Sequence, residues 1–153
     1  ESVRVTEEES QEAYTKVDPG RGDVSRKALV NIRSYHEKQK RYSWFDGTPK
    51  GTLLGQKVTP LRAVGVYVPG GKAAYPSSVL MNIVPAKVAG VEKIVMTTPC
   101  NADGEVNPDT LAAAKDAGAA EIYRAGGAQA IAAQASVTEC IPTVVTIEGP
   151  GNI

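Results

Sequence analysis

The sequence predicts an α/β fold in which a parallel sheet follows a helical hairpin segment. Two observations carry this prediction. The composition changes near Pro60, from mainly polar and charged residues to a stretch dominated by Ala, Val, Gly and Ile. From residue 61 onward, strand patterns alternate with helix patterns, which is typical of parallel sheets with helical crossovers. We therefore expect two regions, residues 1–60 and residues 61–153.

The first region is expected to begin with two helices. Thr6 and Glu9 form a capping-box pattern at the start of a short helix over residues 6–15. A stronger helix is expected over residues 23–39, because its apolar residues recur at helical spacing. These residues share one face: Val24, Ala28, Ile32 and Tyr35.

Three further features complete the first region. Asp18-Pro19-Gly20 is expected to form the turn between the helices. Residues 44–47 are expected to form a loop, with Trp44 and Phe45 in a satellite core contact. A strand is expected over residues 52–59.

The second region is expected to contain four strands and three helices. The strands are expected at residues 63–68, 93–98, 121–123 and 143–147. The clearest helix begins after Asn107 as N-cap and stops at Gly118. Of the other two helices, one begins at Pro76 and one covers residues 128–135. Pro85 should kink or break the helix that begins at Pro76.

Three of the four predicted strands end in glycine-rich turns. The turns are Pro69-Gly70-Gly71, Gly126-Gly127 and Gly149-Pro150-Gly151-Asn152. Ligands of open parallel sheets bind at the carboxyl ends of the strands, and glycine lets the backbone approach a ligand closely. Gly126-Gly127 also leads into a helix N-terminus, which favours an anion such as a nucleotide phosphate. A single Gly-Gly turn is more often a tight connection, so the prediction of a binding edge rests on three turns sharing it.

Charge and hydropathy exclude several classes of partner. Lys plus Arg and Asp plus Glu both number 17, so no net charge attracts nucleic acid or an anionic membrane. No apolar run approaches the roughly 20 residues of a membrane span, and no secretory signal is visible. The cytoplasm is therefore the expected location. Cys100 and Cys140 are expected to be free thiols in a reducing compartment, although a disulfide stays possible.

The sequence lacks the residues for a complete catalytic or metal site. No G-x-G-x-x-G fingerprint follows a predicted strand. His36 is the only histidine, and we interpret it as a packed or partly exposed residue of the helix over 23–39. One histidine and two distant cysteines do not make a typical zinc site, and no Ser-His-Asp set is indicated. We therefore predict no catalytic and no metal-ligating residue in this chain.

The glycine-rich turns and their neighbours resemble the histidinol dehydrogenase family. The first signature of that family resembles residues 65–71 and continues through residues 75–82. The second resembles residues 126–133, and the third resembles residues 149–152. The segment at 55–60 also fits. Because the order and approximate spacing match, the resemblance covers nearly the whole chain.

The resemblance implies an oxidoreductase of histidine biosynthesis, an amino-acid biosynthesis enzyme that oxidises L-histidinol to L-histidine through the aldehyde. It implies two NAD molecules used in turn, a zinc requirement, a homodimer and a Rossmann-like sheet, which is incomplete here. The family's NAD contacts correspond to Tyr67, Gln129 and Asn152. Its zinc ligands, its Glu-His catalytic pair and most of its substrate contacts lie beyond the third signature, so none is carried over.

The same resemblance sets the expected domains. Residues 1–60 would form a helical segment of a second lobe of the parent enzyme, and residues 61–153 a partial Rossmann-like NAD-binding region. The chain opens on Glu1 and closes on Ile153, directly after the third signature, and we interpret it as a fragment that is inactive alone. The alternative is a stand-alone nucleotide-binding or assembly module without catalysis, and the motifs do not separate the two.

Overall fold

Four short strands form a parallel sheet in the order β5-β4-β3-β6. A computed structural model describes residues 3–70 and 73–150. The strands are β3 (Ala63–Tyr67), β4 (Lys93–Thr98), β5 (Glu121–Arg124) and β6 (Thr146–Glu148). The two central strands are almost entirely buried, because helices cover both faces of the sheet. The predicted fold, an α/β arrangement with an incomplete Rossmann-like parallel sheet, is confirmed, although β6 begins three residues later than expected.

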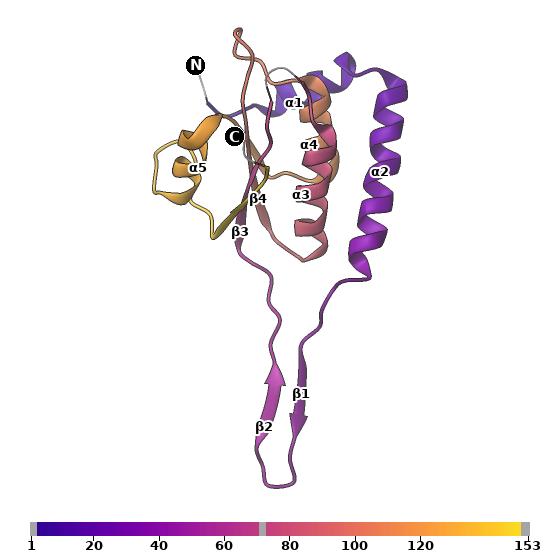
Figure 1. Cartoon of the computed structure of the whole chain (residues 1–153), viewed down its shortest axis with the longest axis vertical. Coiled ribbons are helices and arrows are strands. Elements are labelled where there is room, and N and C mark those ends of the chain that lie inside the picture. Colours follow the sequence, from indigo (N-terminus) through magenta and orange to yellow (C-terminus); the bar gives the residue numbers. More distant parts are fainter. Residues whose placement is uncertain (1–2, 71–72, 151–153) are drawn as a thin grey trace.

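Helices cover the two faces of the sheet unequally (Figure 1). Four helices lie on one face: α1 (Glu7–Lys16), α2 (Pro19–Glu37), α3 (Pro76–Val88) and α4 (Pro108–Ala117). Only α5 (Gly127–Ala135) lies on the other face among the described residues. The helix α1 packs against α4, and α2 packs against α3 and α4. The N-terminal helices therefore extend the helical layer of the sheet region.

The helix ends follow the sequence signals closely, with two corrections. The Thr6–Glu9 capping box and the Asn107 cap are both formed, and Gly118 ends α4 with a left-handed φ of 94°. The expected turn at Asp18 is instead the cap of α2, because its carboxylate accepts the Arg21 N–H at 3.0 Å and the helix begins at once. Pro85 does not break α3, which continues to Val88. A proline in the last turn removes a single ladder hydrogen bond, and burial of the preceding turn holds the helix.

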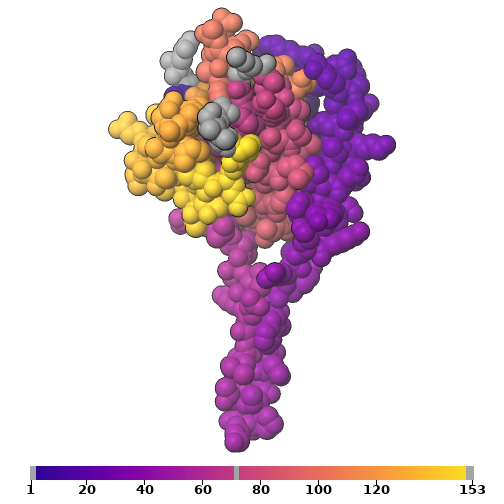
Figure 2. Space-filling model, viewed as in Figure 1, coloured from indigo at the N-terminus to yellow at the C-terminus, as the bar shows by residue number. Residues whose placement is uncertain are grey.

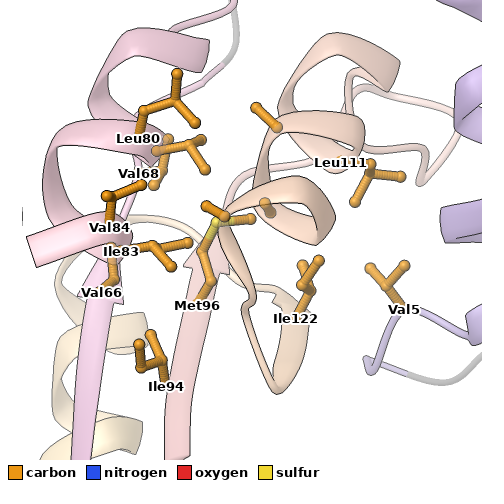
Figure 3. Close-up of a cluster of buried hydrophobic side chains, with 14 of the residues drawn as sticks. Val5, Val66, Val68, Leu80, Ile83, Val84, Ile94, Met96, Leu111 and Ile122 are labelled. Carbon is orange, nitrogen blue, oxygen red and sulfur yellow. The ribbon is translucent and has the colours of Figure 1, made fainter. Parts of the chain in front are cut away.

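The main core lies between the sheet and the four-helix face (Figure 3). Ile83, Ile94 and Met96 are fully buried there, and each such side chain contributes roughly 1.5–3 kcal/mol through burial. From α2, Leu29 joins this core as a buried residue, while Ala28 and Ile32 are partly buried against it. The other members of the predicted stripe, Val24 and Tyr35, are exposed. The stripe prediction is therefore right for the middle of α2 and wrong at its ends.

A two-stranded hairpin projects from the body beyond the amino end of β3 (Figures 1 and 2). Its strands are β1 (Trp44–Gly47) and β2 (Leu53–Gln56), which pair antiparallel. The expected loop over 44–47 is thus a strand, and the expected satellite core contact is wrong, since Trp44 is 55% and Phe45 59% exposed. Residues 44–47 form a strand because they pair with residues 53–56 across the turn. The local sequence does not indicate this pairing.

The N-terminal segment closes one edge of the sheet. The Val5 N–H donates to the Ile122 carbonyl at 2.9 Å, and the Arg124 N–H donates to the Val3 carbonyl at 2.7 Å. An ion pair between Arg124 and Glu9 and a hydrogen bond from the Tyr14 hydroxyl to Asp116 fix α1 beside it. The first region is therefore attached to the sheet region by backbone and side-chain contacts, and its assignment to a second lobe stays a prediction.

Candidate functional site

The glycine-rich turns converge at the carboxyl edge of the sheet, as the parallel strands require. Gly70 and Gly126 both face Pro99, which follows β4: a Cβ on them would lie 3.4 Å and 2.9 Å from Pro99 atoms. Gly149, with a φ of 146°, lies so close to the Tyr67 carbonyl that any side chain would collide with it. The predicted meeting of the three turns is confirmed for these residues, while Gly71 and Gly151 lie outside the described residues.

These close approaches are contacts of the chain with itself. The expectation was that glycine would admit a ligand to the backbone. At Gly126 and Gly149, the space in front of the Cα is filled by Pro99 and by the Tyr67 carbonyl. The glycines therefore allow the strand ends to pack on one another. Side chains and the free end of a helix are the groups that remain at this edge for a ligand to contact.

That free end is the N-terminus of α5. Its N-cap, Gly126, has no side chain that could accept a hydrogen bond, so the first N–H groups of the helix need acceptors from outside the helix. The Gly127 N–H donates to the Tyr67 hydroxyl at 3.2 Å, which ties the end of β3 to the start of α5. The helix dipole and the next N–H groups favour an anion at this point.

The predicted contact residues occupy different situations at this edge. Tyr67 is only 5% exposed, and its hydroxyl is engaged by Gly127; a phenol also keeps its own O–H to donate. Gln129 is exposed in the first turn of α5, and its amide group folds back over Gly127. The structure thus brings Tyr67 and the first turn of α5 together. Asn152 lies outside the described residues.

Sequence reasoning gave no role to the end of β4. Thr98 is buried and, with Gly70, Pro99 and Asn107, lines a cavity of about 220 Å³ at the start of α4. The signal was present in the sequence as two threonines at the end of the predicted strand, followed directly by Pro99. This cavity gives the carboxyl edge a polar recess, and Pro99, which lines it, also faces Gly126 before α5.

The largest pKa shifts belong to tyrosines that are hydrogen-bonded to carboxylates of the fold. Burial raises the pKa of Tyr123 to about 12, helped by its hydrogen bond to Glu121 at 2.7 Å. Burial acts to raise the pKa of Glu121, but hydrogen bonds from Tyr123 and Lys93 outweigh it and lower that pKa. Burial and the hydrogen bond to Asp116 raise the pKa of Tyr14. Because the Tyr123 hydroxyl donates to Glu121 at the start of β5 and Tyr14 pairs with Asp116 from α1, these shifts report structural pairing.

No metal site forms within residues 3–70 and 73–150. No group of three or more His, Cys, Asp or Glu side chains there is arranged to hold an ion. His36 is half-buried on α2, with its Nδ1 2.8 Å from the Gln39 Oε1. Cys100 and Cys140 are exposed free thiols. Within the same ranges, no helix is both long and apolar enough to cross a bilayer.

A parallel α/β sheet whose glycine-rich carboxyl edge meets an uncapped helix N-terminus defines a Rossmann-like protein. The histidinol dehydrogenase family pattern matches residues 1–153. The chain belongs to the histidinol dehydrogenase family, and the resemblance seen in its three signatures is confirmed.

Individual relatives agree with this assignment. The chain is 58% identical over 153 residues to histidinol dehydrogenase of Geobacillus kaustophilus and equally to that of Bacillus subtilis, covering 100% of this chain and 36% of each relative. A crystal structure of histidinol dehydrogenase from Elizabethkingia anophelis matches with a TM-score of 0.93 at 36% identity, covering 99% of this chain and 35% of that one. The chain therefore spans about a third of the length of these relatives.

Proposed function

We propose that this chain forms the NAD-binding part of an enzyme that oxidises L-histidinol to L-histidine through the aldehyde. The observation that carries the proposal is the hydrogen bond from the Gly127 N–H to the Tyr67 hydroxyl. It joins the first family signature to the second at the edge where parallel sheets bind ligands. Family membership supplies the reaction, an oxidation in histidine biosynthesis.

The residues at this edge fit a dinucleotide. The first turn of α5 suits the pyrophosphate, because the N–H groups that follow Gly127 have no partner within the helix and lie at the positive end of its dipole. Tyr67 and Gln129 offer a hydroxyl and an amide beside it, and we propose Asn152 as the third contact. A bound NAD would supply a hydride acceptor for the oxidation. Tyr67, Gln129 and Asn152 would hold and orient it.

Zinc does not fit the described residues, which contain no ligand cluster. We therefore derive no step through zinc and propose that the zinc ligands and the catalytic pair belong to other parts of the complete enzyme. The histidinol substrate, the homodimer and the cytoplasmic location are proposals on the same basis. So is a second lobe that includes residues 1–60.

The test of the NAD site uses Gln129→Ala and Asn152→Ala in the complete enzyme. Each variant should raise the KM for NAD roughly five- to tenfold, the effect of losing one hydrogen bond of about 1 kcal/mol. Gln39→Ala and Asn31→Ala, which remove the same groups from exposed positions of or next to α2, should leave NAD kinetics unchanged. Unchanged NAD kinetics in both site variants would refute the assignment.

The 153-residue chain alone should show negligible turnover. A partial pocket bears the ordering cost of binding without the full set of contacts, so NAD binding to the chain alone is expected to be weak. Measurable NADH production from histidinol by this chain, abolished by a chelator, would contradict the prediction.

A further inference from the structure

The helix α5 has little on its surface to hold it in one position. It has nine residues, and its sequence, Gly-Ala-Gln-Ala-Ile-Ala-Ala-Gln-Ala, is dominated by alanine. Only Ala130 and Gln134 are buried. Alanine side chains are too short to interdigitate with the side chains of the sheet, so few contacts fix the position of this helix on the sheet. Gln134 is the one large side chain that α5 buries.

Gln134 sits over a single rung of the sheet. It is 0% exposed, and its Nε2 donates to the Val95 carbonyl at 3.1 Å. Val95 is the register partner of Gly65 in the β3–β4 pair. A Cβ on Gly65 would lie 2.8 Å from the Gln134 Cδ and Oε1 and 3.0 Å from its Nε2. The Gln134 amide therefore fills the space that a side chain at position 65 would occupy.

Backbone conformation does not explain this glycine. Gly65 lies in the middle of β3 and is absent from the glycines with positive φ. A glycine inside a strand is destabilising relative to alanine, and it commonly marks a close approach of another part of the chain. Here the close approach is that of α5, at the one position where that helix carries a large buried side chain.

We propose that Gly65 and Gln134 are a positioning pair for the nucleotide edge. The Gln134 side chain fits the hollow at Gly65 and sets the height and register of α5 on the sheet. Gln129 lies five residues earlier on the same helix, about 7.5 Å along its axis. A shift at Gln134 therefore moves Gln129 and the Gly127–Tyr67 contact with it. This inference rests on the proposed NAD role of that edge.

The shape of the Gln134 side chain, more than its polarity, sets the position of α5. The Gln134 Oε1 is buried and has no hydrogen-bond partner within the described residues, so the amide gains one hydrogen bond and leaves one acceptor unpaired. Leucine has a similar volume, although it branches at Cγ, one atom earlier than glutamine, and its methyl groups would fill the near part of the same hollow. The pair is thus predicted to tolerate Gln134→Leu and to be disrupted by a change in volume at either residue.

The experiment compares four variants of the complete enzyme: Gly65→Ala, Gln134→Ala, the double variant and Gln134→Leu. Hydrogen–deuterium exchange of residues 127–135 without NAD reports the position of α5, and steady-state kinetics give the KM for NAD separately from kcat. Gly65→Ala should speed exchange in α5 and raise that KM roughly tenfold, with kcat changed much less, because small displacements of binding groups have large effects. Adding Gln134→Ala should restore both readouts towards wild type, and Gln134→Leu should match wild type.

Two results would overturn the proposal: wild-type exchange and KM in Gly65→Ala, or a double variant as impaired as Gly65→Ala. If Gly65→Ala does not fold, the comparison of Gln134→Ala with Gln134→Leu decides, since only the smaller residue should loosen α5. The exchange readout does not depend on NAD. An exchange pattern as expected with no change in NAD kinetics would therefore refute the proposed NAD role of this edge and leave the positioning pair standing.

Discussion

Replacing Gln134 by leucine should stabilise the chain, although it removes a hydrogen bond from the interior. The Oε1 of Gln134 is buried without a partner in the described part of the chain, and such an acceptor costs about 1–3 kcal/mol. The bond from its Nε2 to the Val95 carbonyl returns only about 0.5–1.5 kcal/mol. Leucine removes both the cost of the unpaired Oε1 and the gain from the Nε2 hydrogen bond. It also adds apolar burial at a fully buried site. The balance favours Gln134→Leu by about 1–2 kcal/mol.

Urea unfolding of the 153-residue chain, followed by circular dichroism, measures this difference. For a chain of this size, the gain corresponds to a rise in Tm of roughly 4 °C. Gln129→Leu is the matched control on the same helix, because Gln129 is exposed and a surface change of this kind stays within about 0.5 kcal/mol. A loss of stability of 1 kcal/mol or more in Gln134→Leu would refute the reasoning, since it would mean that the amide is fully satisfied.

Two further predictions concern other parts of the fold. Gly149→Ala should destabilise the chain by about 1–3 kcal/mol in urea unfolding, because its Cβ would meet the Tyr67 carbonyl, whereas Gly47→Ala, with open space around it, should be nearly neutral. The folded chain holds the pKa of Tyr123 at about 12, through burial first and a neighbouring carboxylate second; this lies above the value of about 10 for an unfolded tyrosine. Its contribution to stability is therefore complete below pH 10 and lost between pH 10 and 12. Tyr123→Phe should flatten the fall in unfolding free energy over that range, and an equal flattening in the exposed Tyr42→Phe variant would contradict this.

Local signals in the sequence predicted the elements that local physics controls. Asn107 and Gly118 set the ends of α4, because a side-chain cap and a left-handed glycine act within one turn. The strand over residues 93–98 was predicted to the residue, and Pro99, which cannot donate to the ladder, marks its end. The boundary of α2 was missed at Asp18, where the same residue types serve a turn or a helix cap equally well.

The candidate site divides in the same way. Its motifs were visible as three glycine-rich turns, and the order of strands and helices placed them on one edge. The reason for the glycines was not visible, because Gly65, Gly126 and Gly149 are explained by Gln134, Pro99 and the Tyr67 carbonyl, which are distant in sequence. The capture of the Gly127 N–H by the Tyr67 hydroxyl spans 60 positions and leaves no local trace.

The sequence by itself determined the alternation of strands and helices, the caps and the family of this protein, because these follow from short-range spacing and from ordered motifs. The tertiary structure alone decided that residues 44–47 pair as a strand, that residues 3–5 close the β5 edge and that Gln134 fills the hollow at Gly65. Each of these depends on which distant segments meet. Hydrogen-bond pairing and excluded volume act between neighbours in space, and only the folded chain defines those neighbours.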